Sequence, residues 1–173
     1  MAECNNCIYV HSLRSEKVVA LKSCQVYVAN EAIYVFPVSV SEFGIGLTCK
    51  PFFRLDRASS PIEMGRTVSE ALTHSKEGIP HPRPEDLRSL EKEMVAFTGR
   101  KTWGTFARSV RGAADVGFDV DGKAMVIIPY ARGARNSFVP VNERAVSCSP
   151  DEQTVGTHIL SKIGPEGTDR LSF

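Results

Sequence analysis

The chain has 173 residues, the length of one domain, and its 42% hydrophobic and 24% charged residues are close to the globular average. This composition excludes a disordered chain or a coiled coil, and no apolar run approaches the roughly 20 residues that cross a membrane. The formal net charge of +1 gives no overall attraction to nucleic acid or to anionic lipid. We therefore expect one domain over residues 1–173, loose at 1–6 and 165–173, that does not contact a membrane.

The chain has five cysteines at irregular spacing, which indicates reduced thiols. The N-terminus lacks the features of a secretion signal, so we expect a cytoplasmic protein. Cys24, Cys49 and Cys148 lie among apolar residues, so we expect them to pack as small hydrophobic side chains. Cys4 and Cys7 have the spacing of a zinc knuckle, but a zinc site needs two more ligands and no second pair follows. We expect no metal and no other cofactor.

The first third of the chain has the composition of β-strands. Short runs rich in Val, Ile, Tyr and Phe predict strands at 18–23, 25–29 and 33–40. Pro37 in the third run favours an edge strand or a bulge, because proline cannot donate to a strand ladder. Residues 43–49 could form a further strand, and the polar residues 54–60 predict a loop.

Three helical segments come next. The run Ser60-Pro61-Ile62-Glu63 has the form of a capping box, which predicts a helix that ends at Gly78. A second helix is predicted from Pro84 to Gly99, with an apolar stripe on one face. A short helical turn at 102–110 is expected to bury its aromatic residues.

The clearest β signal surrounds Asp121-Gly122. The β-type runs 113–120 and 123–130 flank this pair, and Asp-Gly in that position predicts a hairpin with a type I′ turn. A loop and two further short strands are expected at 131–136, 137–139 and 145–148.

A second capping box, Ser149-Pro150-Asp151-Glu152, predicts a last helix that ends at Gly164. The apolar residues of this helix have the same spacing as those of the helix that follows Ser60. When the two apolar stripes are aligned, the two capping boxes are offset by two residues. The match could mark a duplicated strand-then-helix unit, although ordinary helix-start patterns explain it more simply. Together the elements predict an α/β protein of the α+β type, with about three helices on a mixed, mainly antiparallel sheet.

No segment carries a catalytic motif. The histidines form no metal-binding pattern, and no nucleophile elbow is present. These histidines are His11, His74, His81 and His158. Three acidic residues, Asp115, Asp119 and Asp121, are predicted to lie on the solvent-exposed face of a hairpin. Side chains alternate along a strand, so Asp115 and Asp119 could also form a carboxylate pair on one face. We expect a protein that is not an enzyme, and keep a hydrolase built on Asp115, Asp119 and a histidine as an alternative.

Basic residues gather in one stretch, at Arg100, Lys101, Arg108 and Arg111, with Trp103 and Phe106 between them. Lys and Arg contact phosphates and aromatic rings stack on bases, so this stretch could bind nucleic acid. The two aromatics fall at helical spacing, however, which favours packing in the core. A nucleic-acid-binding module is therefore an alternative function.

Two long runs and several short ones form an ordered set along the chain. The long runs are GRTVSEALTHSKEGIPHP at 65–82 and LEKEMVAFTGRKTW at 90–103. Shorter ones follow at 116–118, 128–130, 138–140 and, in the last helix, 154–163. In this order they resemble the immunity proteins of bacterial contact-dependent growth inhibition systems.

The resemblance implies a cytoplasmic antitoxin that binds the C-terminal toxin domain of a large surface effector, often a nuclease, and carries no catalytic residues. We expect one cognate toxin domain per chain and no direct contact with nucleic acid. Because binding residues concentrate in loops, we predict the interface around residues 131–136. The predicted partner-binding residues are Tyr130, Arg132, Arg135, Asn136 and Phe138.

Overall fold

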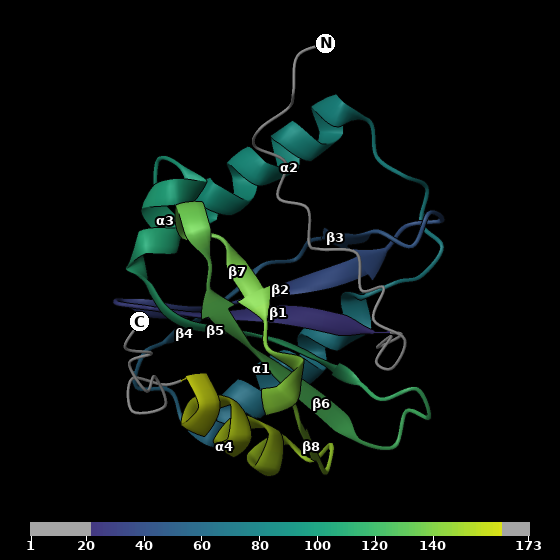
Figure 1. The fold of residues 1–173 in the computed structure, drawn as a ribbon, viewed down its shortest axis with the longest axis vertical. Coiled ribbons are helices and arrows are strands. Elements are labelled where there is room, and N and C mark those ends of the chain that lie inside the picture. The colour runs from purple at the N-terminus through teal and green to yellow at the C-terminus, as the bar shows by residue number, and fades with distance from the viewer. Residues whose placement is uncertain (1–21, 164–173) are drawn as a thin grey trace.

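The computed structural model describes residues 22–163, and the ends predicted to be loose, 1–6 and 165–173, lie outside this range. Within it, four α-helices pack on a curled antiparallel sheet of eight strands, which confirms the predicted α+β class (Figure 1). Most of the predicted strand at 18–23 lies outside the described residues. So do Cys4, Cys7, His11 and Gly164. No helix in the described part is long and apolar enough to cross a membrane.

The sheet has the strand order β3-β2-β1-β5-β6-β7, with β4 pairing with β2 and β8 pairing with β6. All of these pairings are antiparallel. The strands are β1 Ser23–Ala29, β2 Ala32–Val40, β3 Gly46–Thr48, β4 Phe53–Asp56, β5 Val110–Phe118, β6 Met125–Arg132, β7 Phe138–Pro140 and β8 Val146–Cys148. The helices are α1 Pro61–His74, α2 Pro84–Phe97, α3 Trp103–Ser109 and α4 Glu152–Ile163.

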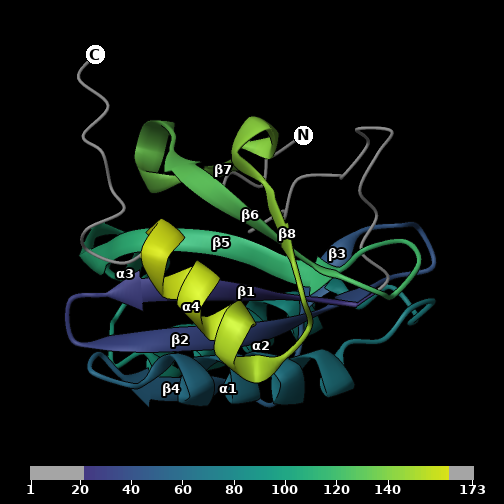
Figure 2. The same ribbon diagram turned by 90° about the horizontal axis from the view of Figure 1, so that it is seen from below.

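The two faces of the sheet carry separate hydrophobic cores. α1 and α4 cover one face and bury aliphatic side chains such as Val26 and Ile127 (Figure 2). α2 and α3 cover the other face, where Tyr34, Phe36 and Phe106 form the centre of an aromatic cluster. Each such buried side chain contributes about 1.5–3 kcal/mol. The alternation of side chains along β1 and β5 therefore assigns neighbouring residues to opposite cores.

Local capping fixes where the helices begin. The Ser60 hydroxyl accepts the Glu63 N–H, and the Glu63 carboxylate accepts the Ser60 N–H at 2.8 Å, which confirms the first capping box. α1 ends at His74, before the predicted Gly78. At the second box the prediction is wrong by two residues: Asp151, and not Ser149, caps α4, because its carboxylate accepts the Thr154 N–H at 2.8 Å.

Two strand predictions also need correction. The predicted loop at 54–60 begins with strand β4, whose alternating burial is too short to stand out in the sequence. The β5–β6 hairpin is confirmed, but its connection is longer than two residues and only Gly122 has a positive φ, 67°. The Asp119 carboxylate closes this connection by accepting the N–H groups of Lys123 and Ala124.

β2 is paired on both sides, and its register with β1 runs through Pro37 without a shift, so both the edge strand and the bulge predicted from Pro37 are wrong. Pro37 falls between the last β4 pair, at Val35, and the first β3 pair, at Val38. Its carbonyl accepts the Cys49 N–H at 2.8 Å, on the outer side of the strand. Proline, which has no N–H to donate, therefore lies where the pairing of β2 passes from β4 to β3.

The same arrangement recurs in the second half of the sheet. The pairing of β7 with β6 has the same register as the pairing of β3 with β2. Each residue of the second pair of strands lies 92 positions after its counterpart in the first pair. β8 takes the place of β4, and Pro129 accepts the Val141 N–H at 2.8 Å, as Pro37 accepts that of Cys49. Capping by Asp151 places the starts of α1 and α4 in register as well, 91 residues apart. α2 and α3 lie between the two halves in sequence.

α1 and α4 cross at two glycines, and the contacts are reciprocal. A Cβ added at Gly65 would lie 1.8 Å from the Glu152 carbonyl oxygen, and one added at Gly156 would lie 1.7 Å from that of Pro61. Each glycine thus meets the first residue of the other helix. This backbone approach explains why both apolar stripes contain a glycine.

Candidate partner-binding surface

The structure brings three of the predicted partner-binding residues together on β6 and β7. Arg132 and Phe138 are directly opposite in the pairing of the two strands, and the Tyr130 and Phe138 rings lie 6.4 Å apart. Asn136 ends a short 3-10 helix, Ala134–Asn136, with a positive φ of 61°. The side chain of Arg135 is outside the described part of the structure. Tyr130, Arg132 and Phe138 therefore lie next to one another on the β6–β7 ladder, and Asn136 lies in the connection between the two strands.

Several of these side chains are already engaged within the fold. The Arg132 guanidinium donates to the carbonyls of Ala107 at 3.1 Å and Val110 at 2.6 Å, and lies 5.5 Å from the centre of the Phe138 ring. Phe138 is half-buried and packs 5.6 Å from Tyr27. These contacts fix the β6–β7 edge to α3 and to the aromatic core, so a partner would meet a rigid surface here.

A buried polar chain crosses the same face of the sheet. Tyr27 donates its hydroxyl to the Gln25 amide oxygen at 3.1 Å, and Gln25 donates to the Tyr130 hydroxyl at 3.2 Å. Tyr130 in turn hydrogen-bonds to Asp115. Burial raises the pKa of Asp115 to about 6, and the hydrogen bonds from Tyr130 and Gln25 offset part of this rise. The solvent-exposed position predicted for Asp115 is therefore wrong.

The acidic residues and histidines of the enzyme alternative do not come together in the described part of the chain. Asp115 lies on the face covered by α2 and α3, since its neighbours in β5 belong to the opposite core. His74 and His158 lie on α1 and α4, beyond the sheet. Asp119 is held in the β5–β6 connection by backbone N–H groups. The three described cysteines are free thiols, and burial raises the pKa of each, which disfavours the reactive thiolate.

Arginines from distant parts of the sequence converge on the β1–β2 turn. Arg111 of β5 donates to the Asn30 side chain at 2.6 Å, and Arg100 forms an ion pair with Glu31 at 2.6 Å. Arg57 donates to the carbonyl of Ala29. Arg100 and Arg111 belong to the predicted basic stretch, whereas Arg57 stood in a segment predicted as a loop. Pairing of β4 with β2 is what carries it to this end of the sheet.

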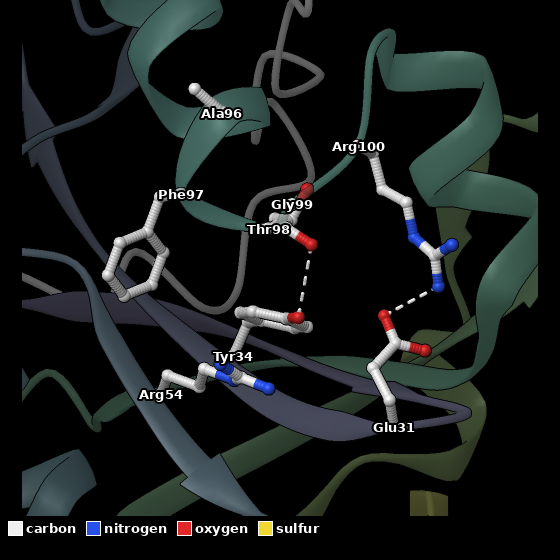
Figure 3. A pocket seen from close by; sticks show the side chains of 8 residues that line it. All are labelled: Glu31, Tyr34, Arg54, Ala96, Phe97, Thr98, Gly99 and Arg100. Carbon is white, nitrogen blue, oxygen red and sulfur yellow. Dashed lines mark hydrogen bonds and ion pairs between the residues drawn. The ribbon is translucent and has the colours of Figure 1, made fainter.

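A pocket of about 370 Å³ opens beside this turn (Figure 3). Its lining includes Glu31, Tyr34, Arg54, Phe97, Gly99 and Arg100. Figure 3 shows Arg54 and Arg100 approaching from opposite sides, with Tyr34 between them. The Tyr34 hydroxyl donates to the Thr98 carbonyl at 3.3 Å, which ties the pocket to the end of α2. Burial, followed by the Glu31 charge, raises the pKa of Tyr34.

The aromatics of the basic stretch are part of the core, as their spacing predicted. Phe106 is fully buried, and Trp103 is half-buried with its ring 5.2 Å from that of Phe106 and 5.8 Å from that of Tyr27. Neither ring is presented as an open stacking platform for bases. Of the two features that favoured nucleic-acid binding, basic residues and aromatic rings that stack on bases, the aromatic rings are therefore not available.

No family model matches this chain, and no curated protein has a matching sequence. Solved structures with the same fold include a protein of unknown function from Neisseria meningitidis, with a TM-score of 0.63 at 16% identity, covering 79% of this chain and 89% of that one. They also include a chain of the CdiA-CT/CdiI toxin and immunity complex from Yersinia pseudotuberculosis, with a TM-score of 0.61 at 17% identity, covering 81% of this chain and 94% of that one. At these identities the likeness shows a shared fold.

Proposed function

We propose that this chain is an immunity protein, which binds and neutralises the C-terminal toxin domain of a contact-dependent growth inhibition effector. The toxin domain is expected to be a nuclease that acts in the cytoplasm, so the chain would meet it there, one molecule to one. Neutralisation needs a shaped surface and no reactive group. The chain would therefore act as a binding protein and not as an enzyme.

The observation that carries this proposal is the fold shared with a chain of a toxin and immunity complex, over 94% of that chain's length. The ordered segments at 65–82 and 90–103 support it independently, because they resemble the same class of protein at the level of sequence.

Two surfaces are the candidates for toxin binding. One is the predicted β6–β7 edge, which carries Tyr130, Arg132, Asn136 and Phe138, with Arg135 in the same loop. The other is the pocket beside the β1–β2 turn. The rigid anchoring of Arg132 and Arg100 suits either surface to tight binding, because little side-chain freedom is lost on association.

Co-expression in a bacterial host tests the proposal. The probe is the C-terminal domain of the effector whose gene, under this proposal, lies directly upstream of the gene for this chain. We expect growth of cells that express both proteins, arrest of cells that express the toxin domain alone, and arrest when a non-cognate immunity protein replaces this chain. Equal arrest with and without this chain would remove the proposed function.

A further inference from the structure

The pocket beside the β1–β2 turn carries more positive than negative charge. Four arginines surround the turn, Arg54, Arg57, Arg100 and Arg111, against the two acids Glu31 and Asp56. Asp56 is partly engaged, since it accepts the Ala58 N–H at 2.8 Å. Arg54 is exposed at the rim and has no ion-pair partner among the described residues. A complementary ligand would therefore be anionic.

Arg100 has hydrogen-bonding capacity that the described residues do not use. Its terminal Nη2 contacts Glu31, but its Nε is buried and has no acceptor within the described part of the chain. A buried donor without a partner costs about 1–3 kcal/mol, and more when it is charged. A carboxylate that entered the pocket would meet the guanidinium groups of Arg54 and Arg100, and a small shift of Arg100 would let it accept from the buried Nε.

The walls of the pocket favour an amino-acid side chain over a nucleic acid. The partly exposed Phe97 offers apolar surface to a carbon stem, whereas Tyr34 is almost fully buried beneath the pocket. Glu31 would repel a run of phosphates, whereas one carboxylate can approach on the side away from it. The volume of about 370 Å³ is at the low end of ligand clefts. Single-stranded nucleic acid instead needs a groove for about 4–16 nucleotides.

We propose that this pocket is a specificity socket for a carboxylate side chain, Asp or Glu, presented by the protein partner. The inference rests on the proposed function, since it takes the toxin domain as that partner. Arg54 and Arg100 would bind the carboxylate, and Phe97 would contact its stem. Arg57 and Arg111 hold the turn in place and add positive potential around the opening.

Titration calorimetry of the full chain with the toxin domain encoded upstream tests this inference. We expect Arg54→Ala and Arg100→Ala each to weaken binding about 10–100-fold, and the double variant to weaken it further. Arg88→Ala is the matched control, because Arg88 is exposed on α2 and does not line the pocket. It should change the affinity less than twofold. Thermal unfolding followed by circular dichroism verifies that every variant is folded, and Arg54→Lys, which keeps the charge, should retain part of the affinity.

The outcomes separate this inference from the proposed function. If the wild-type chain binds and the double variant binds equally well, the socket is refuted and the immunity function stands. If the wild-type chain does not bind the toxin domain, both fall. A 30-nucleotide RNA at low salt is the second probe. RNA binding by the wild-type chain that is lost in the double variant would make the pocket a phosphate site and overturn the inference.

Discussion

Asp115 is the side chain with the greatest conflict between its chemistry and its position. It stands opposite Gln25 at the centre of the sheet, where β1 and β5 pair. Tyr130 and Gln25 lower the cost of its charge, but burial outweighs them, and the pKa of the carboxyl rises to about 6. Protonation of Asp115 at a mildly acidic pH therefore stabilises the folded protein.

Replacing Asp115 by Asn should remove a pH-dependent loss of stability. The folded-state pKa lies above the unfolded value of about 3.9, so the folded state binds the proton more strongly, and the contribution of Asp115 to stability falls as pH rises from about 4 to about 6. Above pH 6 we expect Asp115→Asn to exceed the wild type by about 1–3 kcal/mol, less any loss at Tyr130. Urea unfolding at pH 4, 5, 6 and 7 measures the difference.

The matched control for this change is Asp121→Asn, an exposed carboxylate in the β5–β6 connection. It should follow the wild-type pH profile. A profile for Asp115→Asn that runs parallel to the wild type from pH 4 to 7 would show that this carboxyl is not perturbed by its surroundings.

The close contact between α1 and α4 predicts that a single glycine substitution in either helix destabilises the protein. Gly65→Ala and Gly156→Ala would each drive a methyl group into a backbone carbonyl, at 1.8 and 1.7 Å, so the helices must separate. We expect each change to destabilise the protein by about 2–3 kcal/mol or more, as strong overpacking does. The double variant should cost less than the sum, because one separation relieves both clashes.

Gly104→Ala is the control for helix propensity, since a Cβ there meets no atom closer than 3.9 Å. It should be neutral or stabilise by up to about 1 kcal/mol. Equal unfolding free energies for wild type, Gly65→Ala and Gly156→Ala in urea would mean that the two helices do not approach as closely as described.

At the scale of elements, prediction succeeded where a signal is local and failed where it is not. The capping box of α1, the helix from Pro84 and the β5–β6 hairpin are each specified by a few neighbouring residues. β4 is four residues long, and only its pairing with β2 makes it a strand. In the run 149–152, both Ser149 and Asp151 are good caps, and the apolar stripe that must face α1 decides between them.

The predicted strand-then-helix duplication remains a prediction about how the chain arose. The observation that bears on it is the common spacing of the two halves, including the carbonyls of Pro37 and Pro129 that accept equivalent N–H groups. Capping by Asp151 also removes the offset of two residues that weakened the match in the sequence.

For the molecule as a whole, the fold class could be predicted, and the β1–β2 pocket could not. The periodic runs contain enough information to place helices on an antiparallel sheet. The pocket joins Glu31, Arg54 and Arg100, which three separate segments supply. The pairing of β4 with β2 brings Arg54 to the β1–β2 turn, and the packing of the end of α2 on Tyr34 brings Arg100 there. The predicted residues on β6 and β7 are adjacent for a local reason, because they flank one short loop.

The central claim is that this chain neutralises a toxin by binding it, and titration calorimetry with the purified toxin domain encoded upstream tests it most directly. We predict one-to-one binding in the nanomolar range at physiological salt, as natural complexes of standard interface size show, with loss of toxin activity at the same ratio. No heat of binding at about tenfold excess in the micromolar range, with toxin activity unchanged, would contradict the account.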